Sequence, residues 1–592
     1  MRGPHGARAW AELRLVDDVI WKLERIVGLA ATAVLVVLHA VFLAHAGALW
    51  RDEVNVVNLA SMPLPELWGH LEFDSTPLAF LALLRAWIGI GLGATDLPLQ
   101  ILGCVLGLGV LGVLWWNAQR LGYGVPLIAL ALLGFNAAVI TYGDSVRGHG
   151  LGMLTALLTF GLTWKLVDRP SARNALLALV SAVVSVHSLF FNAVILLAAC
   201  AGGAAVALSR RQWKTIGLLA GVGSVSALSL LPYTVVFQSR KAWNFMIEYP
   251  IDLRWIWERF VEATRLTGPF ALWLWIGLPL IGIITVLAAR RRGVKGSIGK
   301  PAEVGLFCGV ALVTGVIAYL LFLLRLSYTM QPWYFLALMA LVASCLDGAL
   351  LASARQPLRI SRVVVAITAM TLALGPVWQS VHVRKTNLDL IAAKLAQSSQ
   401  TGDLILVMPW YLGITFDRYY RGAAEWLTIP PLPSHKLHRW DQLKEAMASR
   451  DAMKPVLSRI ETALQSGRRV WWIGGLAAPP EGQGPPVLPP ATEAPWGFRE
   501  WPYYQGWGLQ AGYVFRRHAL RAQAVPVPSD APVSPYESPT LDLIEGWRAG
   551  GEVRAAANQL LPLEKPRPSI DRGAAQAVIG EKGRPLRSGP LP

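Results

Sequence analysis

Two adjacent carboxylates, Asp52 and Glu53, follow the first long apolar stretch of the chain, residues 27–46. Such a pair can supply an acid, a base or a metal ligand where membrane and water meet. Acids also favour the first turn of a helix, so the pair could instead cap a helix that begins near Val54. One acid would suffice for a cap. The pattern therefore favours catalysis, with Asp52 as the base and Glu53 as a second member of the site or a residue that orients the loop. The preceding Arg51 could bind phosphate or mark a helix end.

A second polar group lies in the turn 142–149. Asp144 could act as a catalytic acid that orients an acceptor or a metal, and the guanidinium of Arg147 could bind phosphate through two parallel hydrogen bonds. Alternatively, Asp144 and Arg147 could form an ion pair that closes the turn. His149 could bind phosphate or pack.

Weaker candidates for substrate binding lie near the ends of later apolar stretches. His187 could touch a lipid phosphate, although an isolated histidine at an interface is often only solvated. Arg325, Tyr328 and Trp333 could line a donor site, but Trp and Tyr also populate membrane interfaces without any catalytic role.

The composition indicates a membrane protein. Hydrophobic residues make up 54% of the chain, charged residues only 15%, and the mean hydropathy is +0.44. The formal net charge of +17 does not indicate nucleic acid binding, because many Lys and Arg residues lie in short loops between apolar stretches, where they set topology and contact anionic lipid. The four cysteines lie inside apolar stretches and predict no disulfide framework.

Eleven apolar stretches, most of them about 17 to 23 residues long, are predicted to cross the membrane. They are residues 27–46, 99–118, 123–142, 150–167, 174–189, 193–208, 215–237, 269–289, 303–323, 332–351 and 363–381. A further stretch, 77–93, is short and carries Arg85 near its middle, and we expect it to lie along the interface. Lys and Arg then concentrate in the loops of one side, as expected for cytoplasmic loops. This topology places Asp52 and the turn 142–149 on the same, outer face.

From about Arg384 the composition changes to that of a soluble domain. Residues 388–397 have a helical period, and 403–407 and 469–473 are typical of buried strands. These features predict a small extracytoplasmic α/β domain. The predicted organisation is a cytoplasmic amino terminus at 1–26, a transmembrane domain at 27–383 with its first outer loop at 47–98, a periplasmic α/β domain at 384–520, and a disordered, Pro-rich tail at 521–592.

Three segments within about the first 170 residues resemble a known family: Trp50-Arg51-Asp52-Glu53, Asp74-Ser75-Thr76-Pro77-Leu78, and Tyr142 to Leu151. The chain resembles the polyprenyl-phosphate-dependent glycosyltransferases of the GT-C superfamily, close to the protein mannosyltransferase and aminoarabinose transferase group. The resemblance implies a GT-C-like helical fold, a lipid-linked sugar donor and Asp52 as the base. The chain departs from the family at Ser145, where relatives often have Glu two residues before the arginine.

Glycosyl transfer requires these residue types independently of the family. The acceptor hydroxyl must lose a proton to a carboxylate while cations hold the leaving phosphate. The resemblance implies a hexosyl or pentosyl transferase of the bacterial inner membrane. Its donor would be a sugar on polyprenyl phosphate or pyrophosphate, and its acceptor a hydroxyl of an envelope glycan, lipid or protein. No cofactor is certain; neighbouring carboxylates could bind Mg²⁺ or Mn²⁺, and no His or Cys cluster has zinc spacing.

A polytopic lipid or glycan transporter, or flippase, is the alternative function. Such a protein would carry ionisable residues within its spans and interrupted helices, whereas the acids singled out above lie in outer loops. A noncatalytic scaffold would leave these acids without a joint purpose.

Overall fold

The computed structural model describes residues 4–74, 76–236, 238, 252–293, 300–326, 330–351, 356–491 and 500–549. The chain forms two compact units. The helical unit comprises Met1–Val383 together with Lys436–Ala448 and Ala491–Glu500. The α/β unit comprises Arg384–His435, Ser449–Pro490 and Trp501–Pro592.

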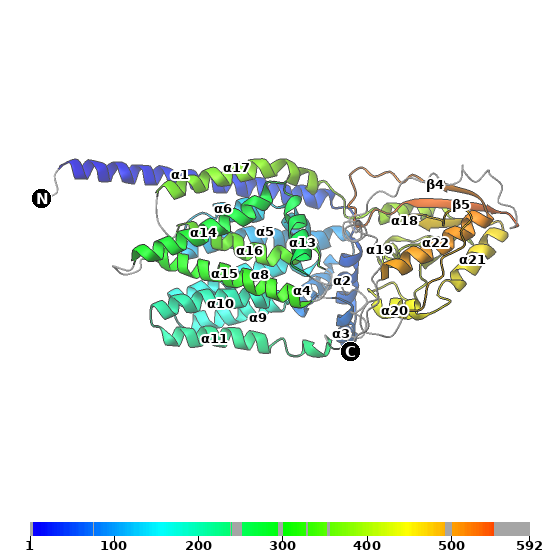
Figure 1. Cartoon of the computed structure of the whole chain (residues 1–592), viewed down its shortest axis with the longest axis horizontal. Helices are drawn as coiled ribbons and strands as arrows, with labels where there is room; N and C mark the ends of the chain where they lie inside the picture. The colour runs from blue at the N-terminus through cyan, green and yellow to red at the C-terminus, as the bar shows by residue number, and fades with distance from the viewer. Residues whose placement is uncertain are drawn as a thin grey trace, which may run out of the picture. The chain divides into compact units, whose positions relative to one another are not determined.

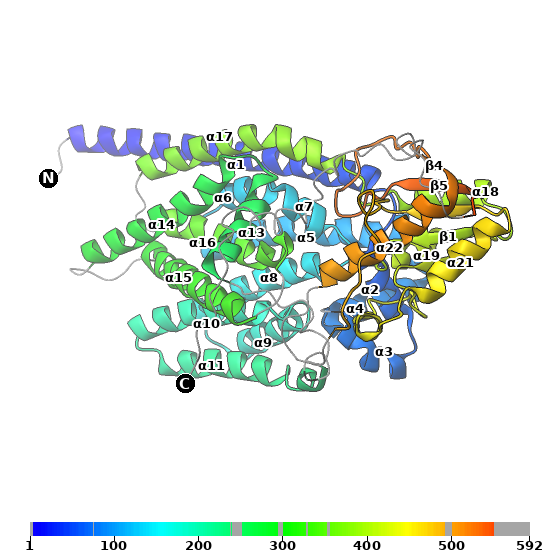
Figure 2. The same cartoon turned by 45° about the vertical axis from the view of Figure 1, so that its right-hand side comes forward.

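Among the described residues of the helical unit, eight helices are long and apolar enough to cross a membrane. They lie in α1 (Pro4–His45), α5 (Asp96–Leu121), α8 (Gly148–Asp168), α10 (Asn192–Ser209), α14 (Ala271–Gly293), α15 (Lys300–Leu326), the run from η5 (Pro332–Phe335) through α16 (Leu336–Leu350), and α17 (Gln356–Val381). The long helices run side by side (Figure 1; Figure 2). Large apolar side chains such as Trp273 and Ile284 point outward from the bundle and are 73% and 65% exposed, as expected for helices that face lipid. The predicted polytopic helical class is confirmed.

The count of eleven spans is not confirmed. The other three predicted spans correspond to α9 (Ala172–Val186), to α11 (Trp213–Leu228), and to a helix interrupted into α6 (Leu127–Ala129), η3 (Leu130–Gly134) and α7 (Ala137–Gly143). The chain leaves the helix at Phe135, and the Asn136 side chain caps α7 by accepting hydrogen bonds from the amides of Ala138 and Val139 at 2.9 and 3.3 Å. This cap satisfies buried amides that the start of α7 would otherwise leave unpaired.

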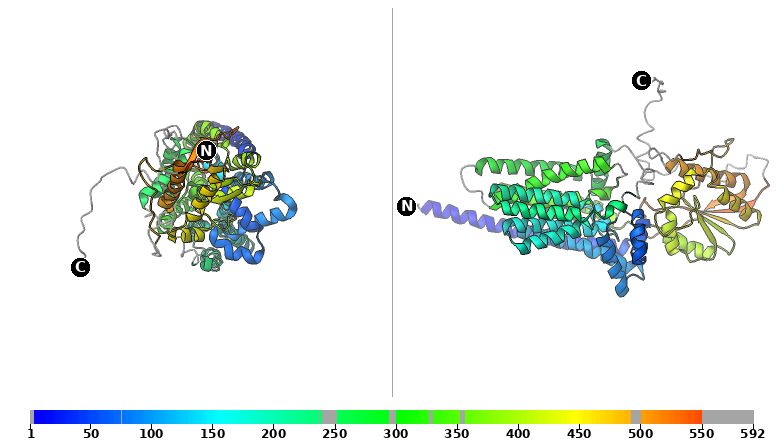
Figure 3. Two further views of the ribbon diagram at one scale, coloured as in Figure 1. Left: turned by 90° about the vertical axis from the view of Figure 1, so that its right-hand side faces the viewer. Right: turned by 90° about the horizontal axis from the view of Figure 1, so that it is seen from below.

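Short helices lie at one end of the bundle. They are α2 (Arg51–Ser61), α3 (Leu64–His70), η1 (Leu71–Phe73), α4 (Leu78–Trp87) and η2 (Ile88–Leu92). Helix α2 runs across the ends of the long helices (Figure 3, right). Arg85 of α4 donates to the carbonyls of Ala60 and Met62 at 3.1 and 2.5 Å and so caps the carboxyl end of α2. The charge that interrupts stretch 77–93 therefore has its partners within the protein. The helical unit also contains α13 (Leu253–Arg265) and α20 (Trp440–Ala448).

The α/β unit is built on a five-stranded sheet with the order β2-β1-β3-β5-β4. Its elements are α18 (Leu388–Ser398), β1 (Leu404–Val407), α19 (Leu412–Tyr419), β2 (Glu425–Thr428), α21 (Lys454–Gln465), β3 (Val470–Ile473), α22 (Glu500–His518), β4 (Ala519–Ala524) and β5 (Leu541–Trp547). Strand β1 pairs in parallel with β2 and β3, and β5 pairs antiparallel with β3 and β4. The strands β1 and β3 are buried throughout because helices pack on the sheet. The helix and the two strands predicted here are confirmed.

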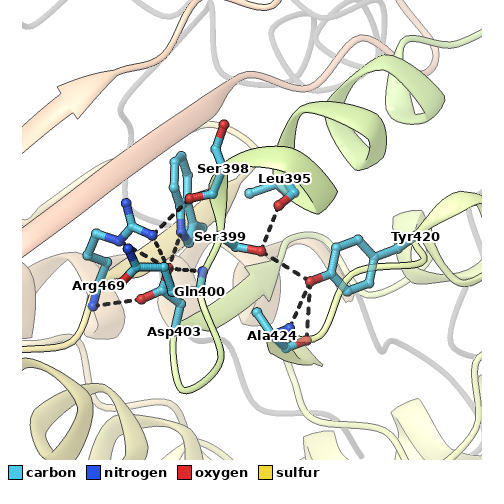
Figure 4. A network of polar contacts seen from close by, with 9 residues as sticks. Leu395, Ser398, Ser399, Gln400, Asp403, Tyr420, Ala424 and Arg469 are labelled. Carbon is cyan, nitrogen blue, oxygen red and sulfur yellow. Dashed lines mark hydrogen bonds and ion pairs between the residues drawn. The ribbon is translucent and has the colours of Figure 1, made fainter.

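Asp403 fixes the beginning of β1 against the beginning of β3. Its Oδ2 accepts hydrogen bonds from Arg469 Nε and Nη2 at 3.0 and 2.7 Å, from Trp471 Nε1 at 3.1 Å and from the Gln400 amide at 2.9 Å (Figure 4). Partial burial raises the pKa of Asp403, but these donors together lower it below its usual value. The network explains why Leu404 and Val470 lie opposite each other.

The predicted tail begins too early. Strand β4 ends beyond residue 520, β5 lies entirely beyond it, and both belong to the sheet. The buried side chains of Leu541, Leu543 and Ile544 attach β5 to the unit. The apolar segment that forms β5 is short and lies in a Pro-rich region, so it gave no sustained periodic signal. Its partner strand β3 lies far away in sequence. The rest of the predicted tail, 550–592, lies outside the described residues.

Candidate active site

Asp52 and Glu53 lie in the first turn of α2, which begins directly after an extended residue, Trp50. Both acids are buried, and they point to different partners. The helix-cap interpretation therefore applies to one of them and not to both.

Glu53 joins the start of α2 to the turn 142–149. Its side chain is fully buried; Oε2 accepts a hydrogen bond from the amide of Trp50 at 3.3 Å, and Oε1 accepts one from the amide of Val146 at 2.8 Å. Both oxygens bind backbone, so the geometry matches a residue that orients the loop.

Asp52 is surrounded by cationic and imidazole groups. It forms an ion pair with Arg147, its Oδ1 lies 3.3 Å from Arg51 Nε, and the same oxygen lies 3.7 Å from Nε2 of His438. Burial raises the pKa of Asp52, but the attraction of Arg147, followed by that of Arg51, outweighs it and holds the pKa below the usual value. Asp52 is therefore a carboxylate at neutral pH.

Arg147 immediately precedes α8 and reaches back to Asp52. The predicted alternative, a local ion pair between Asp144 and Arg147, is wrong, because each residue has a different partner. The buried Nε of Arg147 has no hydrogen-bond partner in the part of the chain that the structure describes. The guanidinium therefore keeps donor capacity beyond its contact with Asp52.

Asp144 and Arg147 do not form one site, because Asp144 contacts a different residue. Its Oδ2 lies 2.7 Å from Nδ1 of His39 in α1, and both side chains are almost fully buried. Sequence reasoning missed His39, although an ionisable residue within the first apolar stretch was an available signal.

Three aromatic rings, one from the residue before α2 and two from the turn 142–149, surround Trp333. Its ring centroid lies 5.9 Å from that of Trp50, 4.9 Å from that of Tyr142 and 6.4 Å from that of His149. His149 is 6% exposed, and neither ring nitrogen has a hydrogen-bond partner among the described residues. Trp333 is therefore buried within the protein beside the Asp52 region, and the interface-belt interpretation of Trp333 is wrong.

His438 is the residue that sequence reasoning missed most completely. Its segment, Lys436–Ala448, belongs to the helical unit although the residues on either side of it belong to the α/β unit. The amide of His438 donates to Asn55 Oδ1 at 2.9 Å, and Asn58 Nδ2 donates to the carbonyl of Lys436 at 2.8 Å. Burial lowers the pKa of His438 to about 4, so its imidazole is neutral at pH 7. No local pattern marks this segment.

Asp74 supports the site from one side. Its Oδ2 accepts from Asn55 Nδ2 at 2.6 Å, and its Oδ1 accepts from the amide of Thr76 at 2.8 Å. Asp74 thus closes the turn before α4 and, through Asn55, steadies the backbone of His438.

The remaining predicted binding residues have no described contact with Asp52. Both ring nitrogens of His187 are engaged, Nδ1 with the Tyr233 hydroxyl and Nε2 with Ser229 Oγ, each at 3.1 Å. Arg325 is exposed at the end of α15. Tyr328 lies outside the described residues.

The acidic pair does not fit a divalent cation. Glu53 uses both oxygens for backbone amides, and Asp52 lies against Arg51 and Arg147. Hard cations need several oxygen ligands that are free to coordinate. Within the described residues, no group of three or more His, Cys, Asp or Glu side chains could hold a metal.

Comparison with protein-family models and with curated proteins gives no match. Solved structures that the chain matches include ArnT from Cupriavidus metallidurans bound to undecaprenyl phosphate, with 14% identity over 75% of this chain and 92% of that chain and a TM-score of 0.42. They also include the Archaeoglobus fulgidus oligosaccharyltransferase in complex with Zn and sulfate, with 13% identity over 75% of this chain and 68% of that chain and a TM-score of 0.44.

Proposed function

We propose that this protein is a membrane glycosyltransferase that moves a sugar from polyprenyl phosphate or pyrophosphate to an acceptor hydroxyl. The observation that carries the proposal is the ion pair of buried Asp52 with Arg147, beside Arg51, at the end of an apolar helical bundle. This arrangement supplies a proton acceptor and phosphate-binding cations within a few ångströms of each other.

Asp52 acts as the base in the proposed reaction. The acceptor oxygen forms a bond to the anomeric carbon and gives its proton to the Asp52 carboxylate, while the bond from that carbon to the phosphate oxygen breaks. The leaving phosphate keeps the electron pair. Arg147 and Arg51 balance its growing charge.

Unused hydrogen-bonding capacity supports a bound substrate beside Asp52. The Nε of Arg147 and the ring nitrogens of His149 are buried without partners among the described residues. Burying such groups unpaired is costly, and phosphate oxygens or sugar hydroxyls would pair them. We assign Arg147 and His149 to the donor phosphate and sugar.

The proposed setting is the outer face of a bacterial inner membrane, with the α/β unit outside the cell membrane. The acceptor would then be a glycan, lipid or protein of the envelope. Neither His187 nor Arg325 is given a role in this reaction.

Release of lipid phosphate from a defined donor tests the function. The full-length protein, reconstituted in liposomes, is supplied with a panel of polyprenyl-phosphate and polyprenyl-pyrophosphate sugars that carry a radioactive hexose or pentose, together with an envelope extract. We expect label in the extract and polyprenyl phosphate or pyrophosphate as product. Transfer from a nucleotide sugar in the absence of lipid carrier would contradict the proposal.

A lipid or glycan transporter is the second candidate, because two features expected of one are present. The predicted span 123–142 is interrupted, and a buried charge cluster lies among the helices. In this cluster Arg362 contacts Glu24 at 2.8 Å and Asp347 at 3.3 Å. Asp347 also accepts from the amides of Ile128 and Ala129 at 3.2 and 3.0 Å.

These contacts favour a structural role for the cluster. Arg359 also contacts Glu24, at 2.8 Å, so two cations balance two carboxylates, and Asp347 satisfies the amides at the start of the interrupted helix. A fluorescent polyprenyl-phosphate sugar that crosses proteoliposome membranes without any change in its chemistry would favour the transporter instead.

A further inference from the structure

The buried pair of His39 and Asp144 has no part in the proposed reaction. The two groups lie 2.7 Å apart, and their side chains are 3% and 2% exposed. Placing ionisable groups in an apolar bundle is costly even when they are paired. Their contact therefore calls for a reason other than stability alone.

Helix α5 is shaped to receive Asp144. A Cβ atom added at Gly103 would lie 1.9 Å from the carbonyl oxygen of Asp144, and one added at Gly107 would lie 1.9 Å from its Oδ1. The Gly107 Cβ would also lie 3.0 Å from Cε1 of His39. Asp144 is thus fixed through both its backbone and its side chain.

No ligand is needed to explain the pair. The cavity beside it, lined by His39, Gly107 and apolar side chains, has a volume of about 10 Å³. That is at most the space of one water molecule. A substrate role for Asp144 therefore has no support from the space around it.

Asp144 begins the turn that carries Arg147. After it, Ser145 Oγ donates to the carbonyl of Tyr142 at 2.6 Å, and the amide of Val146 donates to Glu53 at 2.8 Å. Arg147 then reaches Asp52. Because the turn is only a few residues long, a displaced Asp144 must displace Arg147.

We propose that His39 is a positioning residue, which acts through Asp144 to hold Arg147 against Asp52 and the donor phosphate. This inference rests on the proposed function. His39 itself touches neither Asp52 nor Arg147 among the described contacts, so it positions the site and does not react.

Two glycines of α5 provide a matched test. Gly107→Ala pushes a methyl group against the Asp144 carboxylate, whereas Gly112→Ala places one where nothing lies within 4 Å. His39→Leu removes the contact with Asp144, and His39→Asn keeps a donor near the position of Nδ1. Each full-length variant is reconstituted, and kcat, KM for the lipid-linked donor, Tm and the Kd for polyprenyl phosphate are measured.

We expect Gly107→Ala and His39→Leu to lose about 10-fold to 100-fold in kcat per folded molecule, because displacement of about 1 Å has effects of this size. Polyprenyl phosphate binding should weaken in both. Gly112→Ala should match the wild type, and His39→Asn should recover most of the loss. Wild-type kcat and phosphate affinity in both Gly107→Ala and His39→Leu, or changes in Tm alone, would overturn the inference.

An Asp52→Asn variant in the same series separates the two proposals. If Asp52→Asn is inactive while His39→Leu is fully active, only the positioning role of His39 fails. If Asp52→Asn is as active as the wild type, the proposed reaction fails whatever the His39 variants do.

Discussion

Arg147 forms an ion pair with Asp52, although the two residues stand 95 positions apart in the chain. One precedes α8 and the other lies in the first turn of α2. The contact brings the proposed base and a proposed phosphate ligand into one place and lowers the pKa of the base.

Arg147→Lys should reduce transfer without abolishing it. Lysine keeps the positive charge but lacks the planar fork that binds Asp52 and phosphate together. We expect kcat/KM to fall by about 10-fold to 100-fold, equivalent to about 1 to 3 kcal/mol of transition-state stabilisation. Steady-state kinetics with a lipid-linked donor measure this. A loss as large as that of Arg147→Ala would show that charge alone contributes nothing.

Glu53→Gln should destabilise the loop that carries Arg147. Glu53 accepts hydrogen bonds from two backbone amides, those of Trp50 and Val146. A glutamine side chain has only one acceptor oxygen, so it can accept from only one of them. We expect the free energy of unfolding to fall by about 1 to 3 kcal/mol, together with a loss of activity. The exposed Glu66 supplies the control, since Glu66→Gln should change neither quantity. Unchanged unfolding of Glu53→Gln would contradict its bridging role.

His438 should make stability depend on pH between about 4 and 6.5. Its pKa is about 4 in the folded protein and 6.5 in the unfolded chain, so between these values the unfolded chain binds a proton that the folded protein does not. Stability is therefore fully present above pH 6.5 and falls as the pH drops towards 4, by about 1.4 kcal/mol per pH unit at most.

Thermal unfolding in detergent across this pH range measures the effect. His438→Gln should flatten the decline. Asp52 does not interfere, because its pKa lies below 3.8 and its own contribution is lost only at lower pH. Equal slopes for the wild type and His438→Gln would show that the imidazole titrates normally.

The elements and the catalytic candidates followed from local patterns in the sequence. Apolar length predicted the long helices, and an acidic pair after the first of them predicted Asp52. The contacts between these side chains could not be predicted from local patterns, because they depend on which distant segments meet. The sequence grouped Arg147 with Asp144, three residues away, as a second polar site, but the fold brings Arg147 to Asp52 instead.

The same limit explains what was missed. His438 lies near Asp52 because its segment belongs to the helical unit, although the residues before and after that segment belong to the α/β unit. No local pattern in the sequence predicts this arrangement. The break at Phe135 was hidden because apolar residues continue on both sides of it. Strand β5 was assigned to a tail because its partner β3 lies far away in sequence.

Topology supplies a further prediction. The loop 290–300 should be cytoplasmic, because Lys and Arg gather there. In intact cells, a membrane-impermeant maleimide should label Leu64→Cys, an exposed position expected outside, and should not label Lys295→Cys. Labelling of Lys295→Cys from outside would reverse the orientation.

The central claim is that Asp52 accepts the proton of the acceptor, and Asp52→Asn tests it most directly. The amide keeps the size of the side chain but cannot take up a proton at neutral pH, so transfer per folded molecule should fall by about 100-fold to 10,000-fold, beyond any loss of stability from the broken ion pair with Arg147. Asp74→Asn, which disturbs the hydrogen bonds to Asn55 and Thr76 but leaves the proposed base in place, should lose far less. Equal transfer by Asp52→Asn and the wild type, at matched amounts of folded protein, would contradict the mechanism and leave Asp52 with a structural role.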